Sequence, residues 1–335
     1  MKRLLYASWL FIPFTLLAQD STKSTTSFSF EDVDNTPIKV YCNQKITNQT
    51  PNRFISIGYE LQTASTIKIN NAAWNDSKQF NAMQGIRLNV NTPLVSTNQL
   101  IVNAGAQFAR TAFNGNINAP YPLYNELVED GLHTSGVQLT MFKPLNAKNF
   151  FIFQTSVDAN WLAGSVKQMD TKAATISATA MYGWKKSDNE MIGLGVSRTY
   201  RLGRLIYVPV VLWNKTFNDQ WGVEATFPAK AHVRRNINSK SLLQFGYELE
   251  GNQYAIYTNK ALFANTYLQR GEIKPRFIYE RSIVGFWWLS IQAGLRINGR
   301  MHVVDTYNGS EKNQLITTQF SNPLYFNVSI NLVSL

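Results

Sequence analysis

The feature that most constrains the fold of this chain is a strict alternation of apolar and polar residues. It is clearest near the C-terminus, over Leu324–Leu332, where apolar side chains occupy every even position. Asn327, Ser329 and Asn331 lie between them. Successive side chains of a β-strand point to opposite faces, so this stretch predicts a strand with one apolar and one polar face.

The same alternation recurs from Arg53 onward. It covers residues 55–62, 86–90, 100–108, 137–141, 151–161, 174–182, 192–197 and 287–298. Several runs reach the roughly nine to eleven residues that a tilted strand needs to cross a membrane, whereas strands of soluble proteins usually have about five or six. Gly, Ser, Thr, Asn and Gln on the polar face are typical of a barrel interior. We therefore expect an all-β fold, a transmembrane antiparallel β-barrel over residues 53–335.

The connections between these runs mostly alternate in length, as extracellular loops and periplasmic turns do. The long ones are Ala64–Asn81, Phe113–Gly131, Asn252–Gly271 and Gly299–Asn322, and the short ones are Pro93–Asn98, Pro144–Asn149, Lys185–Asn189 and Arg281–Gly285. Thirteen strands are visible, but a single-chain bacterial barrel has an even number. The region 220–240 hides either a turn near Pro228 or a bulged strand, so we predict about 12–14 strands and favour fourteen.

The C-terminal end departs from the regular alternation. Val333, Ser334 and Leu335 reverse the apolar parity that holds up to Leu332. Either a bulge shifts the register there, or the strand ends at Leu332.

The N-terminus has the pattern of a secretory signal peptide. Lys2 and Arg3 precede the apolar stretch 4–17, and Ala18 provides a small residue for cleavage. We predict a signal peptide over residues 1–18. Residues 19–52 are rich in Ser, Thr and Asn and predict a loosely ordered periplasmic leader.

Composition agrees with a barrel in the bacterial outer membrane. Charged residues make up 16% of the chain, against about 25% in ordinary soluble domains. No later stretch has the roughly twenty apolar residues of a spanning helix. Cys42 is the single cysteine, so no intramolecular disulfide can form.

The chain carries a formal net charge of +11, which favours anionic partners. We expect contact with outer-membrane lipid, with the phosphates of lipopolysaccharide and with a small solute. Nucleic acid is not an expected partner behind a signal peptide. His232 and His302 lie far apart without nearby ligands at metal-binding spacing, so no metal or cofactor is predicted.

Charged residues of both signs fall on the polar parity and are candidates for lining the barrel lumen. They are Glu60, Arg87, Glu224, Glu248, Glu250, Lys274, Arg276, Glu280 and Arg296. In an open channel, rings of such charges select solutes by sign. Alternatively, opposite charges on neighbouring strands pair and fill the interior, which we favour slightly around Glu248, Glu250, Lys274 and Arg276.

Tryptophans gather near the predicted strand ends. They are Trp161, Trp184, Trp213, Trp221 and Trp287. Aromatic side chains at such positions are typical of the belts that flank the apolar band of a membrane barrel. We predict that these five form such a girdle.

One stretch, Leu205–Trp213, is apolar on both faces and contains Pro209, which cannot donate a ladder hydrogen bond. It predicts a bulged strand whose inner face packs on an inward loop. The alternative is a subunit contact or an apolar ligand site.

His133 and Ser135 share the lipid-facing parity of one run. A histidine in this position can activate a serine for attack on an ester. The pair is similar to the His-x-Ser pair of outer-membrane phospholipases and lipid A deacylases, but Gly136 stands where those families have Asn. We therefore keep a lipid esterase as a remote alternative and expect no enzyme.

The N-terminal pattern, the alternation and the terminal strand resemble outer-membrane barrels of Bacteroidota type, whose closing strand is recognised by the barrel-assembly machinery. Within these, residues 197–254 resemble a barrel family that carries a domain-of-unknown-function label. The residues that carry this resemblance are Arg198–Tyr200, Pro209, Trp213, Phe227–Lys230 and Phe245–Gly251. The resemblance implies fold and location but no activity. We expect a porin-like channel for small, anionic solutes, and the alternative is a non-conducting surface receptor or structural barrel.

Overall fold

The computed structural model describes residues 39–70, 75–116, 122–162, 171–257 and 266–334. The predicted signal peptide, residues 1–18, lies outside these ranges, as do residues 19–38 of the predicted leader. Both remain predictions.

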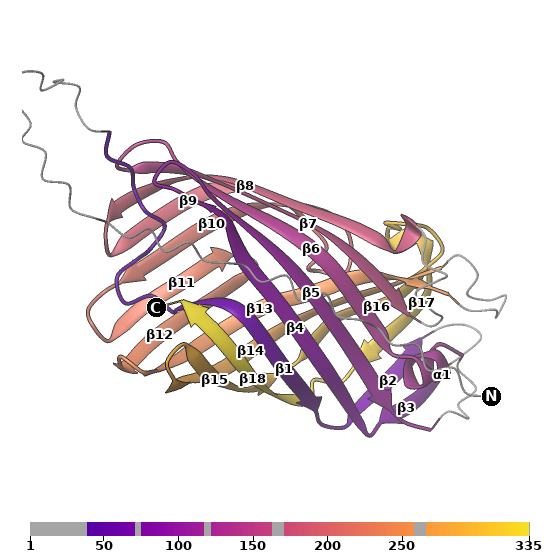
Figure 1. The fold of residues 1–335 in the computed structure, drawn as a ribbon. Coiled ribbons are helices and arrows are strands. Elements are labelled where there is room, and N and C mark those ends of the chain that lie inside the picture. Colours follow the sequence, from indigo (N-terminus) through magenta and orange to yellow (C-terminus); the bar gives the residue numbers. More distant parts are fainter. Residues whose placement is uncertain (1–38, 71–74, 117–121, 163–170, 258–265, 335) are drawn as a thin grey trace, which may run out of the picture. The chain divides into compact units, whose positions relative to one another are not determined.

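Within the described residues, fourteen strands form a closed antiparallel barrel (Figure 1). They are β1 (Asn52–Gln62), β4 (Ala82–Ser96), β5 (Ile101–Asn114), β6 (Leu132–Pro144), β7 (Asn149–Leu162), β8 (Ala174–Ser187), β9 (Glu190–Thr199), β10 (Ile206–Thr216), β11 (Trp221–Phe227), β12 (Lys230–Asn238), β13 (Ser241–Ile256), β14 (Tyr267–Val284), β15 (Trp287–Leu295) and β18 (Leu324–Ser334). The first and last strands close the ring, since β1 pairs with both β4 and β18. The predicted fold class is confirmed with fourteen strands.

The ambiguous region 220–240 contains two short strands, β11 and β12, separated by Pro228 and Ala229. These two residues form the turn between β11 and β12, which pair from Trp221↔Arg235 to Thr226↔Lys230. A turn this short between two short strands leaves little loop sequence to mark it, which is why the region 220–240 was ambiguous.

The two ends of the barrel differ in their connections. At the short-turn end, β4–β5, β6–β7, β8–β9, β10–β11, β12–β13 and β14–β15 are joined by two to four residues each. Most connections at the opposite, long-loop end are much longer. No helix within the described part of the chain has the length and apolar character to span a bilayer.

Strand β18 shows how the alternation is used. Ile330 is 48% exposed on the outer face, while Asn327, Ser329 and Asn331 are buried on the inner face. The strand does not end at Leu332: Val333 also points inward and packs with Leu242 and Trp288. The register shift lies on the partner strand, between Arg53 and Ile55 of β1.

Four further strands extend the wall at the long-loop end. They are β2 (Ser65–Asn70), β3 (Asn75–Phe80), β16 (Ile297–Val304) and β17 (Gln314–Phe320), and β16 continues the pairing of β14 beyond β15. Helix α1 (Pro122–Glu129) and the single-turn helices Thr171–Ala173 and Glu311–Asn313 lie in the connections. Figure 1 shows β2, β3, β16, β17 and α1 gathered at this end.

An apolar core fills the long-loop end. It consists of sixteen buried side chains: Ile67, Ile69, Phe80, Met83, Phe113, Leu123, Tyr124, Leu127, Leu132, Leu162, Tyr254, Ile256, Leu268, Met301, Val303 and Ile316. Phe80 stacks on Tyr124 with 4.5 Å between ring centroids and lies 5.0 Å from Phe113. This cluster, here called the outer core, occupies the barrel end that the sequence alone left open.

Residues 39–51 lie against the short-turn end and are packed rather than loosely ordered. Their backbone hydrogen bonds join Cys42 N to Asn146 O at 3.0 Å and Thr47 N to Asp188 O at 2.9 Å, in two different turns. The Asn236 side chain, from β12, donates to Asn48 O at 3.1 Å. The prediction of a loose leader is therefore wrong for this part, here called the mouth segment.

The mouth segment also explains the strand that is apolar on both faces. Cys42 and Ile46 are buried with Phe150, Val210 and Leu212, and Val208 packs against the same cluster. The inner face of β10 thus packs on an inward segment, as the first of the two interpretations predicted, but the predicted bulge is absent, since the register of β10 with β9 and β11 is continuous.

We expect Phe80→Ala to lower the free energy of unfolding by about 3–5 kcal/mol, because it opens a cavity in the outer core. The free energy of unfolding is measured in urea, with the heat-modifiable mobility of the barrel on gels as the signal for the folded state. Phe217→Ala is the control, since Phe217 is largely exposed. Equal stability losses for the two variants would contradict a packed outer core.

Candidate functional site

A cavity of about 660 Å³ lies inside the barrel between the outer core and the apolar cluster around Cys42 and Ile46 of the mouth segment. Its lining includes Leu132 and Tyr254 from the outer core and Met181 and Val210 from the other end. Seven basic and five acidic residues line it: Arg53, Arg87, Arg201, Lys230, Arg270, Lys274 and Arg276, and Glu60, Asp158, Glu248, Glu250 and Glu272. We call this cavity the chamber.

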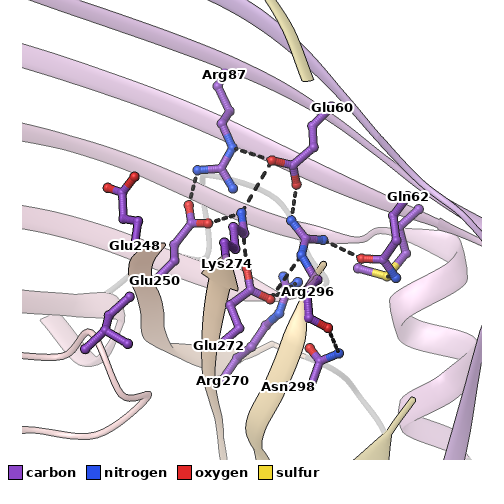
Figure 2. A network of polar contacts seen from close by, with 12 residues as sticks. Glu60, Gln62, Arg87, Glu248, Glu250, Arg270, Glu272, Lys274, Arg296 and Asn298 are labelled. Carbon is purple, nitrogen blue, oxygen red and sulfur yellow. Dashed lines mark hydrogen bonds and ion pairs between the residues drawn. The ribbon is translucent and has the colours of Figure 1, made fainter. Parts of the chain in front are cut away.

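A network of ion pairs forms one wall of the chamber (Figure 2). Glu60 of β1 contacts Arg296 directly, Lys274 at 3.4 Å and Arg87 at 3.6 Å. Arg296 also donates to Gln62 Oε1 at 2.7 Å. One carboxylate from β1 is thus held by basic groups from β4, β14 and the end of β15.

Neighbouring strands complete the network. Glu250 of β13 and Glu272 of β14 lie opposite each other in register, an arrangement that is unfavourable for two like charges. Lys274 contacts Glu250 and lies 3.2 Å from Glu272, and Arg270 lies 3.0 Å from Glu272. The basic side chains therefore neutralise the two opposed glutamates.

Two smaller groups of charges lie nearer the short-turn end. Glu248 pairs with Arg276, which donates to Gln292 Oε1 at 3.1 Å. Glu224 accepts hydrogen bonds from Thr50 N and Oγ1, both at 2.9 Å, and lies 3.1 Å from Arg234 Nε.

Glu280 pairs with Arg53 at the start of β1. Together with the Glu224 contacts, this pair anchors the end of the mouth segment to the barrel wall.

All nine charged residues proposed from the sequence therefore lie on the inner side with an oppositely charged partner. The structure follows the pairing interpretation for Glu248, Glu250, Lys274 and Arg276. Sequence reasoning missed Arg270 because it assigned residues 252–271 to a loop, and it missed Glu272 at the boundary of that loop. Both continue the parity of Lys274, and this parity was the available signal.

The opposite wall of the chamber is polar and carries few charges. Asp158 of β7 accepts a hydrogen bond from Gln107 Nε2 at 2.5 Å and one from Ser156 Oγ at 3.1 Å. Asn160 bridges Thr134 and Thr175 at 2.8 Å each. The chamber thus has a charged wall facing a wall of amides and hydroxyls.

Four of the five predicted girdle residues lie at the short-turn end. Trp184, Trp221 and Trp287 are exposed there, and Trp213 is half-buried. Trp161 is different: it lies at the long-loop end of β7, is only 5% exposed and stacks on His133. Because its side chain is buried, Trp161 does not present a ring to lipid as a girdle residue would.

The His133 ring makes its contacts with groups other than Ser135. It contacts Asp130 O at 3.0 Å and stacks on Trp161 at 5.1 Å between ring centroids. No hydrogen bond between His133 and Ser135 is present among the described residues, so the geometry does not support a nucleophile and base pair. In the same part of the chain, no three His, Cys, Asp or Glu side chains are grouped to hold a metal ion.

Comparison with known proteins places the chain in a family. Residues 118–332 match the model described as domain of unknown function (DUF6268). The chain belongs to this family. A search of curated proteins gave no match.

Solved structures with a similar fold are outer-membrane proteins. A Pseudomonas putida F1 outer membrane channel, COG4313, is 10% identical, with a TM-score of 0.42, and the match covers 85% of this chain and 97% of that one. A Pseudomonas aeruginosa FadL homologue is 7% identical, with a TM-score of 0.41 and coverage of 84% and 90%. The Pseudomonas putida toluene transporter TodX is 10% identical, with a TM-score of 0.35 and coverage of 85% and 90%. At these identities the likeness concerns the fold alone.

We expect Arg296→Met to destabilise the barrel by about 2–3 kcal/mol, because it removes the buried guanidinium that contacts both Glu60 and Glu272 and leaves these carboxylates to Arg87, Arg270 and Lys274. Lys215→Met is the matched control: Lys215 pairs with Glu190 near the surface, where the loss is below about 1 kcal/mol. Unfolding in urea measures both. A similar small effect for both variants would show that the buried network contributes little to stability.

Burial raises the pKa of the Cys42 thiol above its ordinary value. We therefore expect alkylation of Cys42 by iodoacetamide at pH 8 to be slower in the folded barrel than in urea, and to accelerate as the pH rises. Mass spectrometry of the labelled chain measures the rate. Equal rates in the folded and unfolded chain would show that the mouth segment leaves its place.

Proposed function

We propose that this protein is a gated channel of the bacterial outer membrane that admits small, preferentially anionic solutes. The observation that supports this is the chamber itself, a polar cavity of about 660 Å³ inside the barrel. A structural barrel has no need of an internal cavity lined by charges of both signs.

The sign of the solute follows from the charges around the chamber. Basic lining residues exceed acidic ones by two. Most of the charges are paired, but Lys230 is exposed at the tip of the β11–β12 hairpin and Arg201 is 3.8 Å from Glu248, which already pairs with Arg276. The excess positive potential therefore lies near Arg201 and Lys230, where it attracts anions.

Passage requires one end of the barrel to open, and the mouth segment is the easier end. It contributes only Cys42 and Ile46 to its apolar cluster, whereas the outer core consists of sixteen buried side chains. Displacing the mouth segment therefore exposes less apolar surface than opening the outer core.

The second candidate is a non-conducting receptor or structural barrel. The outer core favours it, since sixteen packed apolar side chains at the long-loop end offer no polar lining to a solute there. Conductance separates the two candidates.

We expect deletion of residues 40–49 to raise single-channel conductance in planar bilayers about threefold or more, because it removes the mouth segment and keeps the contacts of Thr50 and Arg53. The protein without the deletion is the reference. A silent barrel in both forms, with normal heat-modifiable mobility, would favour the non-conducting alternative.

We expect Lys230→Gln, introduced into the variant that lacks residues 40–49, to lower the preference for anions. The measurement is the reversal potential in a potassium chloride gradient, which should shift toward the equilibrium potential of potassium. Lys240→Gln is the control, because Lys240 lies in the turn between β12 and β13, away from the chamber. An unchanged reversal potential for Lys230→Gln would contradict the assignment of charge selection to this region.

A further inference from the structure

The strand register leaves a gap in the barrel wall above the β11–β12 hairpin. Strand β10 pairs with β9 over Ile206–Lys215 but with β11 only from Val211 onward. Strand β13 pairs with β14 as far as Ala255 but with β12 only as far as Glu248. Residues 206–210 of β10 and 249–254 of β13 therefore face each other with no strand paired between them.

The top of the gap is closed by other parts of the chain. The end of β13 pairs in parallel with β7, through Ala255↔Trp161 and Ile256↔Leu162. Below this pairing, the loop 200–205 between β9 and β10 lies across the gap. Arg201 of this loop donates a hydrogen bond to Leu249 O at 3.0 Å, the first carbonyl of β13 beyond its pairing with β12.

The loop packs backbone to backbone on a pair of glycines. Gly251 and Gly271 face each other in the β13–β14 register. A Cβ on Gly271 would lie 2.6 Å from the carbonyl carbon of Leu202, and one on Gly251 would lie 2.7 Å from Arg201 O. The loop thus occupies a position that only glycine leaves free, and Arg201 is its polar tie to β13.

The chamber extends to this gap. Its lining includes Leu202 of the loop, Ile206 and Val208 of β10, Leu249 of β13, and Pro228 and Ala229 at the tip of the hairpin. These six residues are apolar, while Arg201 and Lys230 lie beside them in the same part of the lining.

The height of the β11–β12 hairpin along the barrel axis determines whether the gap faces the hydrocarbon layer or water. From Trp221 at the short-turn end to Phe227 at the tip, β11 extends about 20 Å along the strand, or about 15 Å along the axis of a barrel with ordinary strand tilt. The apolar band of such barrels is about 25 Å tall. The gap therefore begins within the hydrocarbon layer, and its outer rim is apolar, with Tyr207 69% exposed and Phe227 also exposed.

We propose that the chamber opens sideways into the bilayer through the gap between β10 and β13, with the loop 200–205 as its lid and Arg201 as the latch. Open strand edges are not tolerated against lipid unless they are covered or line a cavity, and here the loop and the chamber meet that requirement. Molecules that use this opening carry an apolar part, because they cross from hydrocarbon. The proposal does not depend on conduction.

Fluorescence quenching by lipid-borne nitroxides tests this directly. In a Cys42→Ser background, a small thiol-reactive fluorophore is attached at Ile206→Cys, beside the gap, or at Gln138→Cys, on the closed wall. Both positions line the chamber. In vesicles of phosphatidylcholine with nitroxide-labelled acyl chains, we expect at least about twofold stronger quenching at position 206.

Arg201→Ala should increase lipid quenching at position 206 further and leave position 138 unchanged. Arg235→Ala is the control, since Arg235 lies over Trp221 at the short-turn end. Equal lipid quenching at both positions, or quenching at position 206 by aqueous iodide alone, would overturn the proposal. If Arg201→Ala fails to fold, the comparison of positions 206 and 138 in the protein that retains Arg201 still tests the sideways opening.

Discussion

Every backbone amide and carbonyl that faces hydrocarbon must be hydrogen-bonded, and the rest of this structure depends on that constraint. Fourteen strands meet it by closing on themselves, with β1 joined to β18 over ten residue pairs. Closure also creates an inside. The polar parity of each strand, which a soluble sheet would give to water, is turned into a lumen that the chain must fill or hydrate.

The chain fills this lumen in layers along the barrel axis. The outer core excludes water from the long-loop end, the mouth segment covers the short-turn end, and charged side chains surround the chamber between them. Because Glu60 and Glu272 are buried and Glu250 is partly buried, each depends on basic partners from neighbouring strands. The same network therefore rigidifies β1, β4, β13 and β14 and leaves the opposite wall free to face the cavity.

The incomplete barrel pairing above the β11–β12 hairpin is tied to the chamber. The β11–β12 hairpin is too short to seal the wall, and the chain covers the remainder with the loop 200–205 instead of a strand. Arg201, Gly251 and Gly271 hold that cover in place without a continuous ladder. A loop held by side-chain hydrogen bonds, such as those of Tyr200 and Arg201, and by backbone packing opens more readily than a paired strand, which is why the sideways route belongs here.

The sequence by itself determined the fold class, most strand positions and which charges point inward, because a period of two fixes the face of every side chain once the strands exist. Pro209 and Pro228 even marked the gap, since proline suits strand edges and turns. Only the tertiary structure decided that Trp161 is covered, that Arg270 and Glu272 join Glu60, and that residues 39–51 cover the mouth. Those contacts join segments far apart in the chain, and alternation carries no information about which strand, or which end of the barrel, a segment meets.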